Sequence, residues 1–105
     1  MNLNDLITFI KDSPTAWHAV DEIRKRLVEH GFFPLYEGDK WEAQPGKSYF
    51  VIRGGSIIAF SLPTKQPVKA TILGTHTDSP ALKLKPNPLF FEGDLPFLRV
   101  ETYGS

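Results

Sequence analysis

The stretch from Thr71 to Pro80 constrains the fold of this chain more than any other part of its sequence. Its first residues are apolar or small, and they lead directly to His76, with Asp78 two places later. A nearly continuous apolar run of this kind is typical of a strand that is covered on both faces of a sheet. Pro80 ends the stretch, because proline has no N–H to donate to a sheet ladder. We therefore predict a strand over residues 68–75 that places His76 at its end.

His76 and Asp78 are the residues of this stretch that can carry chemistry. On extended backbone, side chains two residues apart point the same way, so the imidazole and the carboxylate should share one face. One interpretation is a metal-binding histidine whose ring is oriented by the neighbouring carboxylate. The other is a loop histidine that bonds to Asp78 for structural reasons alone. The spacing does not decide between them, since a catalytic zinc ion usually needs three protein ligands.

The composition is typical of a soluble globular chain of one domain at most. Twelve basic and twelve acidic residues cancel among 105, so net charge does not favour nucleic acid or an anionic membrane as a partner. Cysteine is absent, which excludes a disulfide framework and cysteine-ligated zinc. No apolar run has the length of a membrane span, and no basic segment followed by an apolar one opens the chain. We expect a cytoplasmic protein with no nucleic-acid partner and no membrane partner.

Two helices are expected before any strand. Apolar residues at helical spacing predict the first helix, with Asn2 as its N-cap and its end before Ser13. Ser13 is the expected N-cap of the second helix, Pro14 suits its first position, and Gly31 suits the position after its end. The predicted buried stripe of the second helix consists of Ala16, Val20, Ile23 and Leu27, widened by Trp17 and Val28.

The pattern changes to strands and turns after the second helix. The aromatic run at residues 32–36 is expected to pack the end of that helix onto a sheet. Residues 48–53 and 56–62 are expected to form a β-hairpin around Gly54 and Gly55. Glycine suits this position because two-residue hairpin turns require positive backbone φ angles.

Two later strands are predicted at residues 82–85 and 97–103, separated by a loop that prolines interrupt. The predicted fold class is α/β, with two N-terminal helices packed on a mixed β-sheet. This inventory is unbalanced, because a sheet covered on both faces needs helices on both faces and only two helices occur, both before the sheet. We therefore expect residues 1–105 to be the N-terminal segment of a larger domain.

Other candidate sites are explained more simply by structure. His18 and His30 lie on the second helix, about a third of a turn apart around its axis, and are interpreted as surface or packing residues. Ser79 has no glycine-flanked nucleophile elbow around it, which argues against a serine hydrolase. Lys83 and Lys85 are interpreted as the solvated face of a strand rather than as a site for single-stranded nucleic acid.

The residues from His76 to Pro80 read HTDSP, and this motif strongly resembles that of the aspartyl aminopeptidase and vacuolar aminopeptidase I family of zinc metallopeptidases. The resemblance runs in order from about Leu6 to the end of the chain. Besides the motif, the segments that carry it are Ser13-Pro14, Trp17–Val20, Gly31-Phe32, Trp41, Pro45–Lys47, Tyr49-Phe50, Ile57–Phe60 and Val100–Gly104.

The resemblance implies a zinc-dependent aminopeptidase that removes N-terminal residues, often acidic ones, from peptides. It implies that His76 is a zinc ligand and that Asp78 is the catalytic-site carboxylate that orients it, in a site with two zinc ions. It further implies that residues 1–105 are an incomplete zinc-peptidase (phosphorylase/hydrolase-like) catalytic domain, and that the complete family proteins assemble as homo-oligomeric dodecamers. The remaining ligands are expected beyond residue 105, so the chain alone should be inactive and should bind zinc weakly at best.

Two alternatives to this function stay open. In the first, the chain is a truncated, non-enzymatic relative that serves as an assembly or binding module. In the second, it is a structural domain in which His76 and Asp78 merely bond to each other. Zinc titration of longer and shorter chains that contain the HTDSP motif would separate binding from structure.

Overall fold

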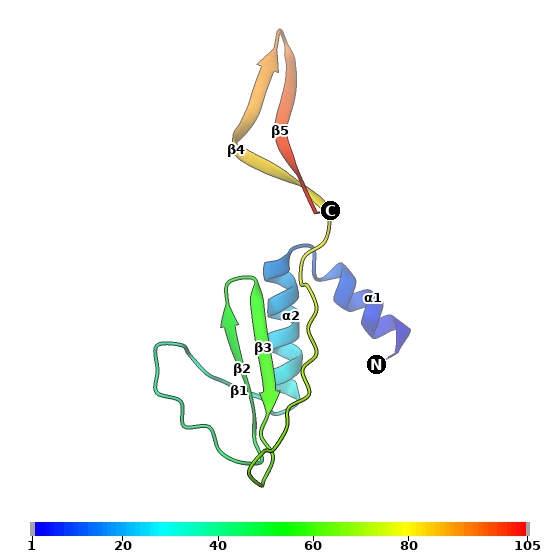
Figure 1. Ribbon diagram of the computed structural model, residues 1–105. Helices are drawn as coiled ribbons and strands as arrows, with labels where there is room; N and C mark the ends of the chain where they lie inside the picture. Colours follow the sequence, from blue (N-terminus) through cyan, green and yellow to red (C-terminus); the bar gives the residue numbers. More distant parts are fainter. Residues whose placement is uncertain (1, 105) are drawn as a thin grey trace.

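The computed structural model describes residues 2–104, which form a body and a separate β-hairpin (Figure 1). An extended segment links the two parts. The predicted α/β class, with two N-terminal helices and a mixed sheet, is confirmed. In chain order the elements are α1 (Leu3–Lys11), α2 (Ala16–Glu29), β1 (Phe33–Pro34), β2 (Ser48–Arg53), β3 (Ser56–Ser61), β4 (Ala81–Glu92) and β5 (Leu95–Tyr103).

The N-termini of the two helices differ in how well the sequence predicts them. α1 begins with the predicted cap: the Asn2 side chain accepts a hydrogen bond from the backbone N–H of Asp5, whose carboxylate accepts one from Asn2 in return. For α2 the predicted cap is wrong, because the N-cap is Thr15 and not Ser13. The Thr15 hydroxyl accepts from the backbone N–H of His18, whereas the Ser13 hydroxyl is buried and has no hydrogen-bond partner among residues 2–104.

One face of α2 packs on the sheet, while α1 packs on α2 and extends away from it (Figure 1). Gly31, with φ of 83°, follows the C-cap of α2 as predicted. The predicted stripe is too wide, since Trp17 and Val28 are 66% and 49% exposed. A three-stranded sheet covers only part of the helix, so the side chains at the border of the stripe stay in solvent. The core of the body is small and consists of Ala19, Val20, Tyr49 and Phe50.

The body's sheet is mixed, with β1 parallel to β2 and β2 antiparallel to β3. The β2–β3 hairpin turns through Gly54 and Gly55 as predicted. Of these two glycines only Gly54 has a positive φ, 55°, as in the hairpin turn that places glycine at the first central position. The Tyr49 ring packs between its neighbours on the two adjacent strands, 6.2 Å from the Phe33 ring and 5.9 Å from the Phe60 ring.

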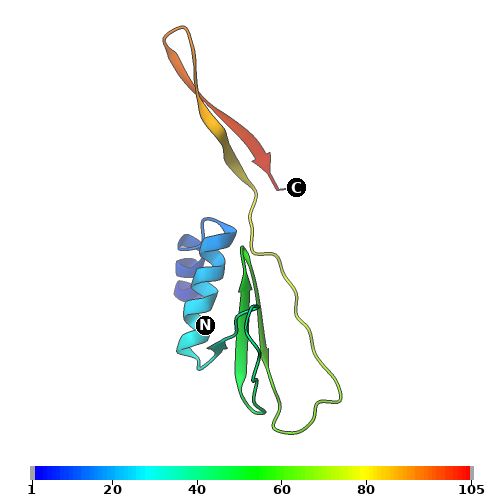
Figure 2. The same ribbon diagram turned by 90° about the vertical axis from the view of Figure 1, so that its left-hand side faces the viewer.

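The strand predicted over residues 68–75 is not formed. Residues 62–80 follow an extended path without helix or strand, and Figure 2 shows most of this path standing apart from the sheet. Val68 and Leu73 are 96% and 95% exposed. A strand needs a neighbour to pair its N–H and C=O groups, and no strand among residues 2–104 pairs with this segment. His76 therefore lies in a loop and not, as predicted, at the end of a strand.

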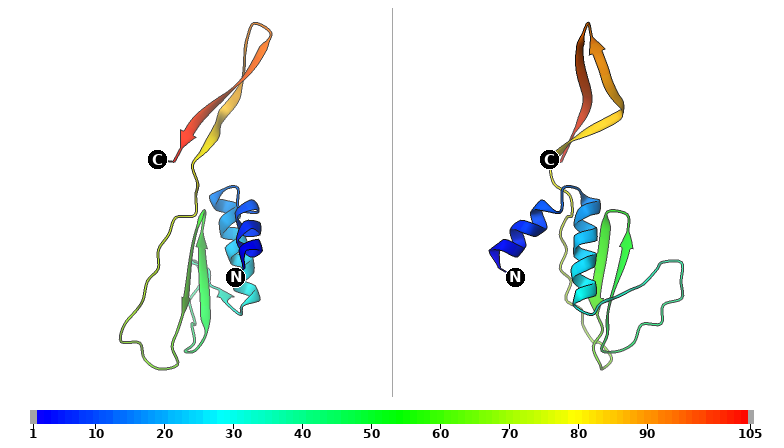
Figure 3. Two further views of the ribbon diagram at one scale, coloured as in Figure 1. Left: turned by 90° about the vertical axis from the view of Figure 1, so that its right-hand side faces the viewer. Right: turned by 180° about the vertical axis from the view of Figure 1, so that it is seen from behind.

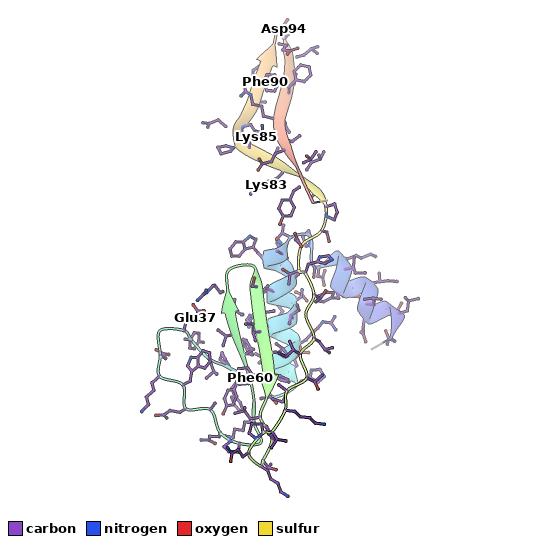
Figure 4. The ribbon with its side chains drawn as sticks, in the orientation of Figure 1. Glu37, Phe60, Lys83, Lys85, Phe90 and Asp94 are labelled. Carbon is purple, nitrogen blue, oxygen red and sulfur yellow. The ribbon has the colours of Figure 1, made fainter. Side chains whose placement is uncertain are left out.

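β4 and β5 form an antiparallel hairpin that also departs from the prediction. β4 is one continuous strand rather than a short strand followed by a loop. Its prolines fit because the pairing is irregular between Leu84 and Leu89, where a proline does not have to donate to the ladder. Asn87, with φ of 51°, lies in this irregular stretch. The hairpin turns at Gly93 and Asp94, and Figure 4 shows Asp94 at its far tip.

The described residues form an elongated molecule rather than a sphere. Their radius of gyration is 19.3 Å, whereas a compact domain of this length has one of about 13 Å. The difference comes from the β4–β5 hairpin, which projects from the body in every view, with the C-terminal end of the chain at its base (Figure 3). Apolar side chains such as Leu82 and Phe91 are exposed on it. No helix among residues 2–104 is long and apolar enough to cross a membrane.

Candidate functional site

Residues 76–80, here called the HTDSP loop, lie where the extended segment passes the β2–β3 turn. The hydroxyl of Thr77 donates a hydrogen bond of 2.7 Å to the backbone carbonyl of Gly55, in a half-buried contact. The same turn lies against the start of α2, because a Cβ on Gly54 would be only 3.1 Å from Cη2 of Trp17. Thr77 therefore attaches the loop to a turn that the first residues of α2 support.

His76 and Asp78 contact each other in this loop. Nδ1 of His76 lies 2.8 Å from the backbone oxygen of Asp78 and 3.2 Å from its carboxylate Oδ1. Both oxygens are acceptors, so Nδ1 carries the proton and donates it. In the neutral ring Nε2 then keeps its lone pair, which is the form in which histidine binds a metal. The imidazole is 78% exposed, so a ligand can reach it.

The reason for this contact differs from the one expected. The prediction relied on strand alternation, but the loop is not part of a strand. The chain instead turns so that the imidazole of His76 reaches both the main chain and the side chain of Asp78. A contact that includes the backbone carbonyl depends less on the rotamer of the carboxylate. Asp78 therefore holds the His76 ring through two acceptors, its backbone carbonyl and its carboxylate.

Asp78 has a second partner in Tyr103, the last residue of β5. The Tyr103 hydroxyl donates a hydrogen bond of 2.8 Å to Oδ2 of Asp78. This bond, the backbone N–H of Asp78 and the nearby His76 ring together lower the pKa of the Asp78 carboxyl below its ordinary 3.8. The same bond raises the pKa of the Tyr103 hydroxyl above its ordinary 10.0. At neutral pH the carboxylate is therefore ionised and accepts from both neighbours.

The other two histidines lie elsewhere, as predicted. Nδ1 of His18 is 2.7 Å from the Thr15 hydroxyl at the N-terminus of α2, and Nδ1 of His30 is 2.7 Å from the backbone oxygen of Arg26 at its C-terminus. Both are exposed and belong to the two ends of the helix. Their hydrogen bonds to the helix ends explain them without a metal.

The residues present fit one ligand of a zinc site. His76 offers an oriented imidazole with an accessible ring, and Asp78 holds its other nitrogen, which is the usual arrangement around a metal-binding histidine. Among residues 2–104, however, no group of three or more His, Asp and Glu side chains comes close enough together to hold a metal ion. Since catalytic zinc takes three protein ligands, the described residues do not form a complete catalytic zinc site.

Two cavities of the body lie away from the HTDSP loop. An apolar hollow of about 440 Å³ is formed between α1 and α2, where Phe9 and Ile23 are among its lining residues. A smaller one of about 220 Å³ lies between α2 and the residues around β1, including Tyr36. Neither of these two cavities is lined by residues of the HTDSP loop.

Thr77 and Tyr103 were missed by reasoning from the sequence, although both fix the geometry of the loop. A signal for Tyr103 does exist in the residue after it. Gly104 has φ of 103°, and a Cβ there would be 2.7 Å from Cα of Pro80. Glycine suits this position because it allows a positive φ and a close approach of the backbone to the end of the loop. For Thr77 no comparable signal is present in the sequence.

Comparison with known proteins gives the family of the chain. Residues 9–105 match the family described as aminopeptidase I zinc metalloprotease (M18). A relative from Clostridium novyi, called probable M18 family aminopeptidase 2, is 42% identical over an alignment that covers 96% of this chain and 24% of the relative. A relative from Ricinus communis, called probable aspartyl aminopeptidase, is 40% identical over 96% of this chain and 21% of its own length.

Solved structures agree with this match. A chain in the cryo-EM structure of the Ape4 and Nbr1 complex superposes with a TM-score of 0.88 and 40% identity, over 96% of this chain and 20% of that one. The structure of Chaetomium thermophilum mApe1 gives a TM-score of 0.77 and 26% identity, over 95% of this chain and 24% of that one. The chain belongs to the M18 family of zinc metallo-aminopeptidases. It spans about a quarter of the length of the curated relatives it matches.

Proposed function

We propose that this chain is part of a zinc-dependent aminopeptidase, in which His76 is one of the zinc ligands and Asp78 is the carboxylate that orients it. The observation that carries the proposal is the imidazole of His76, which is exposed and held through Nδ1 by Asp78. Family membership supports the class of reaction, and the exposed His76 imidazole supports the assignment of the ligand.

The chain's own residues would contribute orientation and charge to the reaction. Asp78 accepts a hydrogen bond from the Nδ1–H of His76, which increases the basicity of the ring and keeps Nε2 free of a proton. Zinc bound at such a site supplies a Lewis acid that polarises a carbonyl and lowers the pKa of bound water. The other ligands would come from the part of an M18 polypeptide that this chain does not span.

Three finer features belong to the same proposal. The substrate would be a peptide with an acidic N-terminal residue, which is supported by the name of the relative from Ricinus communis. The complete site would hold two zinc ions, and the complete protein would be a homo-oligomer, a dodecamer by resemblance to the family. A cytoplasmic location remains a prediction from the sequence alone.

A hybrid enzyme tests the proposal. Residues 1–105 would replace the matching segment of the Clostridium novyi relative, with which they share 42% identity. We expect the hybrid to release the N-terminal residue from aspartyl and glutamyl peptides and to lose this activity in the His76→Ala variant. His30→Ala is the matched control, because that histidine caps the end of α2 and lies outside the HTDSP loop. It should leave activity within about twofold.

The outcomes of this experiment separate the candidate functions. Full activity of the His76→Ala hybrid would show that His76 is not a zinc ligand. A folded hybrid that is inactive in both its unsubstituted and its His30→Ala form would favour a binding or assembly module instead. The exposed apolar side chains of the β4–β5 hairpin support that second function, because such a surface can bind another protein.

A further inference from the structure

Tyr103, the last residue of β5, reaches the HTDSP loop at the base of the β4–β5 hairpin. Its hydroxyl is 2.8 Å from Oδ2 of Asp78, although the two residues are 25 positions apart in the sequence. The hairpin leaves the loop just after Pro80, turns at its tip and returns to the same place (Figure 1). The hydrogen bond therefore connects the end of β5 to the loop that precedes β4.

The pairing of β4 with β5 explains why Tyr103 arrives at this position. Ala81, the first residue of β4, is the partner of Tyr103 in the antiparallel register. Asp78 lies only three residues before Ala81, so the register itself places the phenol ring beside the carboxylate. The close approach of Gly104 to Pro80 adds a second contact at the same junction, since a Cβ on Gly104 would be 2.7 Å from Cα of Pro80.

The two carboxylate oxygens of Asp78 serve different neighbours. Oδ2 accepts from the Tyr103 hydroxyl, while Oδ1 lies 3.2 Å from Nδ1 of His76. A carboxylate is planar, so fixing one oxygen also fixes the direction of the other. A hydrogen bond to Oδ2 therefore limits rotation of the carboxylate and keeps Oδ1 toward the imidazole. In an exposed loop the carboxylate would otherwise rotate freely. The hydrogen bond therefore restricts a rotation that packing would already restrict in a buried carboxylate.

We propose that Tyr103 is a positioning residue, which orients Asp78 and through it fixes the imidazole of His76 with Nδ1 protonated and Nε2 free. The Tyr103 hydroxyl donates to Oδ2 of Asp78, and Nδ1 of His76 lies 2.8 Å from the backbone oxygen of Asp78 and 3.2 Å from its Oδ1. The importance of these contacts for zinc rests on the proposed function. The effect of Tyr103 on the imidazole does not, and it can be measured without metal.

The position of the ring proton tests the proposal on the 105-residue chain itself. Long-range ¹H–¹⁵N NMR spectra distinguish a protonated from an unprotonated ring nitrogen. A neutral imidazole carries its one ring proton on either Nδ1 or Nε2. In the unsubstituted chain we expect the proton of His76 on Nδ1. The Tyr103→Phe variant removes one oxygen and keeps the ring, and it should move a measurable part of the population to the Nε2–H form.

Two further variants make the result decisive. Tyr36→Phe removes the same atom from an exposed tyrosine outside the HTDSP loop, and it should leave the His76 signals unchanged. Asp78→Asn alters the acceptor of the Tyr103 hydroxyl, and it should shift the ¹³Cζ resonance of the Tyr103 ring. This second measurement needs only Tyr103 with its hydroxyl in place, so it serves if the Tyr103→Phe chain does not fold.

The proposal is overturned if the Tyr103→Phe chain keeps its amide spectrum and shows the same Nδ1–H population as the unsubstituted chain. It is also overturned if Asp78→Asn leaves the Tyr103 ring resonance in place. A tautomer shift, together with a hybrid enzyme whose activity does not change in the His76→Ala variant, would support the positioning role of Tyr103 and refute the zinc role of His76. The two proposals can therefore fail separately.

Discussion

The hydroxyl of Thr77 donates a hydrogen bond of 2.7 Å to the backbone carbonyl of Gly55, 22 positions earlier in the chain. This half-buried contact lies between the two residues that carry the proposed chemistry, His76 and Asp78. The extended segment before it is exposed and unpaired, so Thr77 attaches the loop to the body at a point that is itself supported by Trp17. The position of the imidazole relative to the sheet depends on that attachment.

We predict that Thr77→Val loosens the HTDSP loop and that Thr77→Ser does not. Valine has the shape of threonine without the donor, so the carbonyl of Gly55 loses its partner, at a cost of roughly 1 kcal/mol in the free energy of unfolding. Denaturant titration measures this cost, and ¹⁵N relaxation of residues 76–78 reports the mobility of the loop. Equal relaxation in the valine, serine and unsubstituted chains would show that the bond does not hold the loop.

We predict that Gly54→Ala destabilises the chain by about 1–2 kcal/mol, which is the cost of a left-handed backbone conformation for a residue with a Cβ. Gly54 has φ of 55°, and its new Cβ would also lie 3.1 Å from Cη2 of Trp17. Gly38→Ala is the control, because no heavy atom lies within 4 Å of a Cβ placed there and its φ is not in that region. Thermal unfolding of the two variants should differ clearly, and similar midpoints would contradict the geometry of the turn.

We predict opposite results for the two candidate caps of α2. Thr15→Ala removes the acceptor of the backbone N–H of His18 and should cost about 1 kcal/mol of stability. Ser13→Ala removes a buried hydroxyl without a partner, so it should be neutral or stabilising. The free energy of unfolding from denaturant titration tests both. A larger loss for Ser13→Ala than for Thr15→Ala would restore the cap predicted from the sequence.

We predict a pH-dependent contribution of Asp21 to stability. Hydrogen bonds from Arg24 and Lys25 lower the pKa of its carboxyl below the ordinary 3.8. A carboxyl with a lowered folded-state pKa stabilises the fold fully above pH 3.8, and the contribution is lost as the pH falls through the folded-state pKa. The stability difference between the unsubstituted chain and Asp21→Asn should therefore be present at neutral pH and vanish in acid.

The matched control for this titration is Asp39→Asn, since no ion pair of Asp39 occurs among residues 2–104. Its stability difference from the unsubstituted chain should not follow the same pH course. Because the Asp21 carboxylate is exposed, salt should also reduce its effect. A difference for Asp21→Asn that stays constant from neutral pH into acid would contradict the prediction.

Local signals in the sequence were sufficient for those elements that are stabilised by nearby residues. The Asn2 cap, the end of α2 at Gly31 and the turn at Gly54 depend on residues a few positions away, and each was predicted correctly. The cap of α2 was missed because Ser13 and Thr15 both offer a hydroxyl. In the structure only the Thr15 hydroxyl accepts from the backbone of α2.

The wrong predictions concern segments whose contacts are distant in the sequence or that no described strand pairs with. The apolar run at 68–75 has the composition of a buried strand, but no strand among residues 2–104 pairs with it, so it stays extended and exposed. The contact of Asp78 with Tyr103 depends on the register of a hairpin that begins three residues later, and residue spacing could not reveal it. The pair of His76 and Asp78 was found because it is local.

A crystal structure of the zinc-loaded hybrid enzyme tests the assignment of His76 most directly. Anomalous scattering would locate the zinc ions without reference to the protein atoms. We predict Nε2 of His76 at about 2.0–2.1 Å from a zinc ion, with Nδ1 still directed at Asp78. Zinc held entirely by other residues, with the His76 ring outside the coordination sphere, would contradict it.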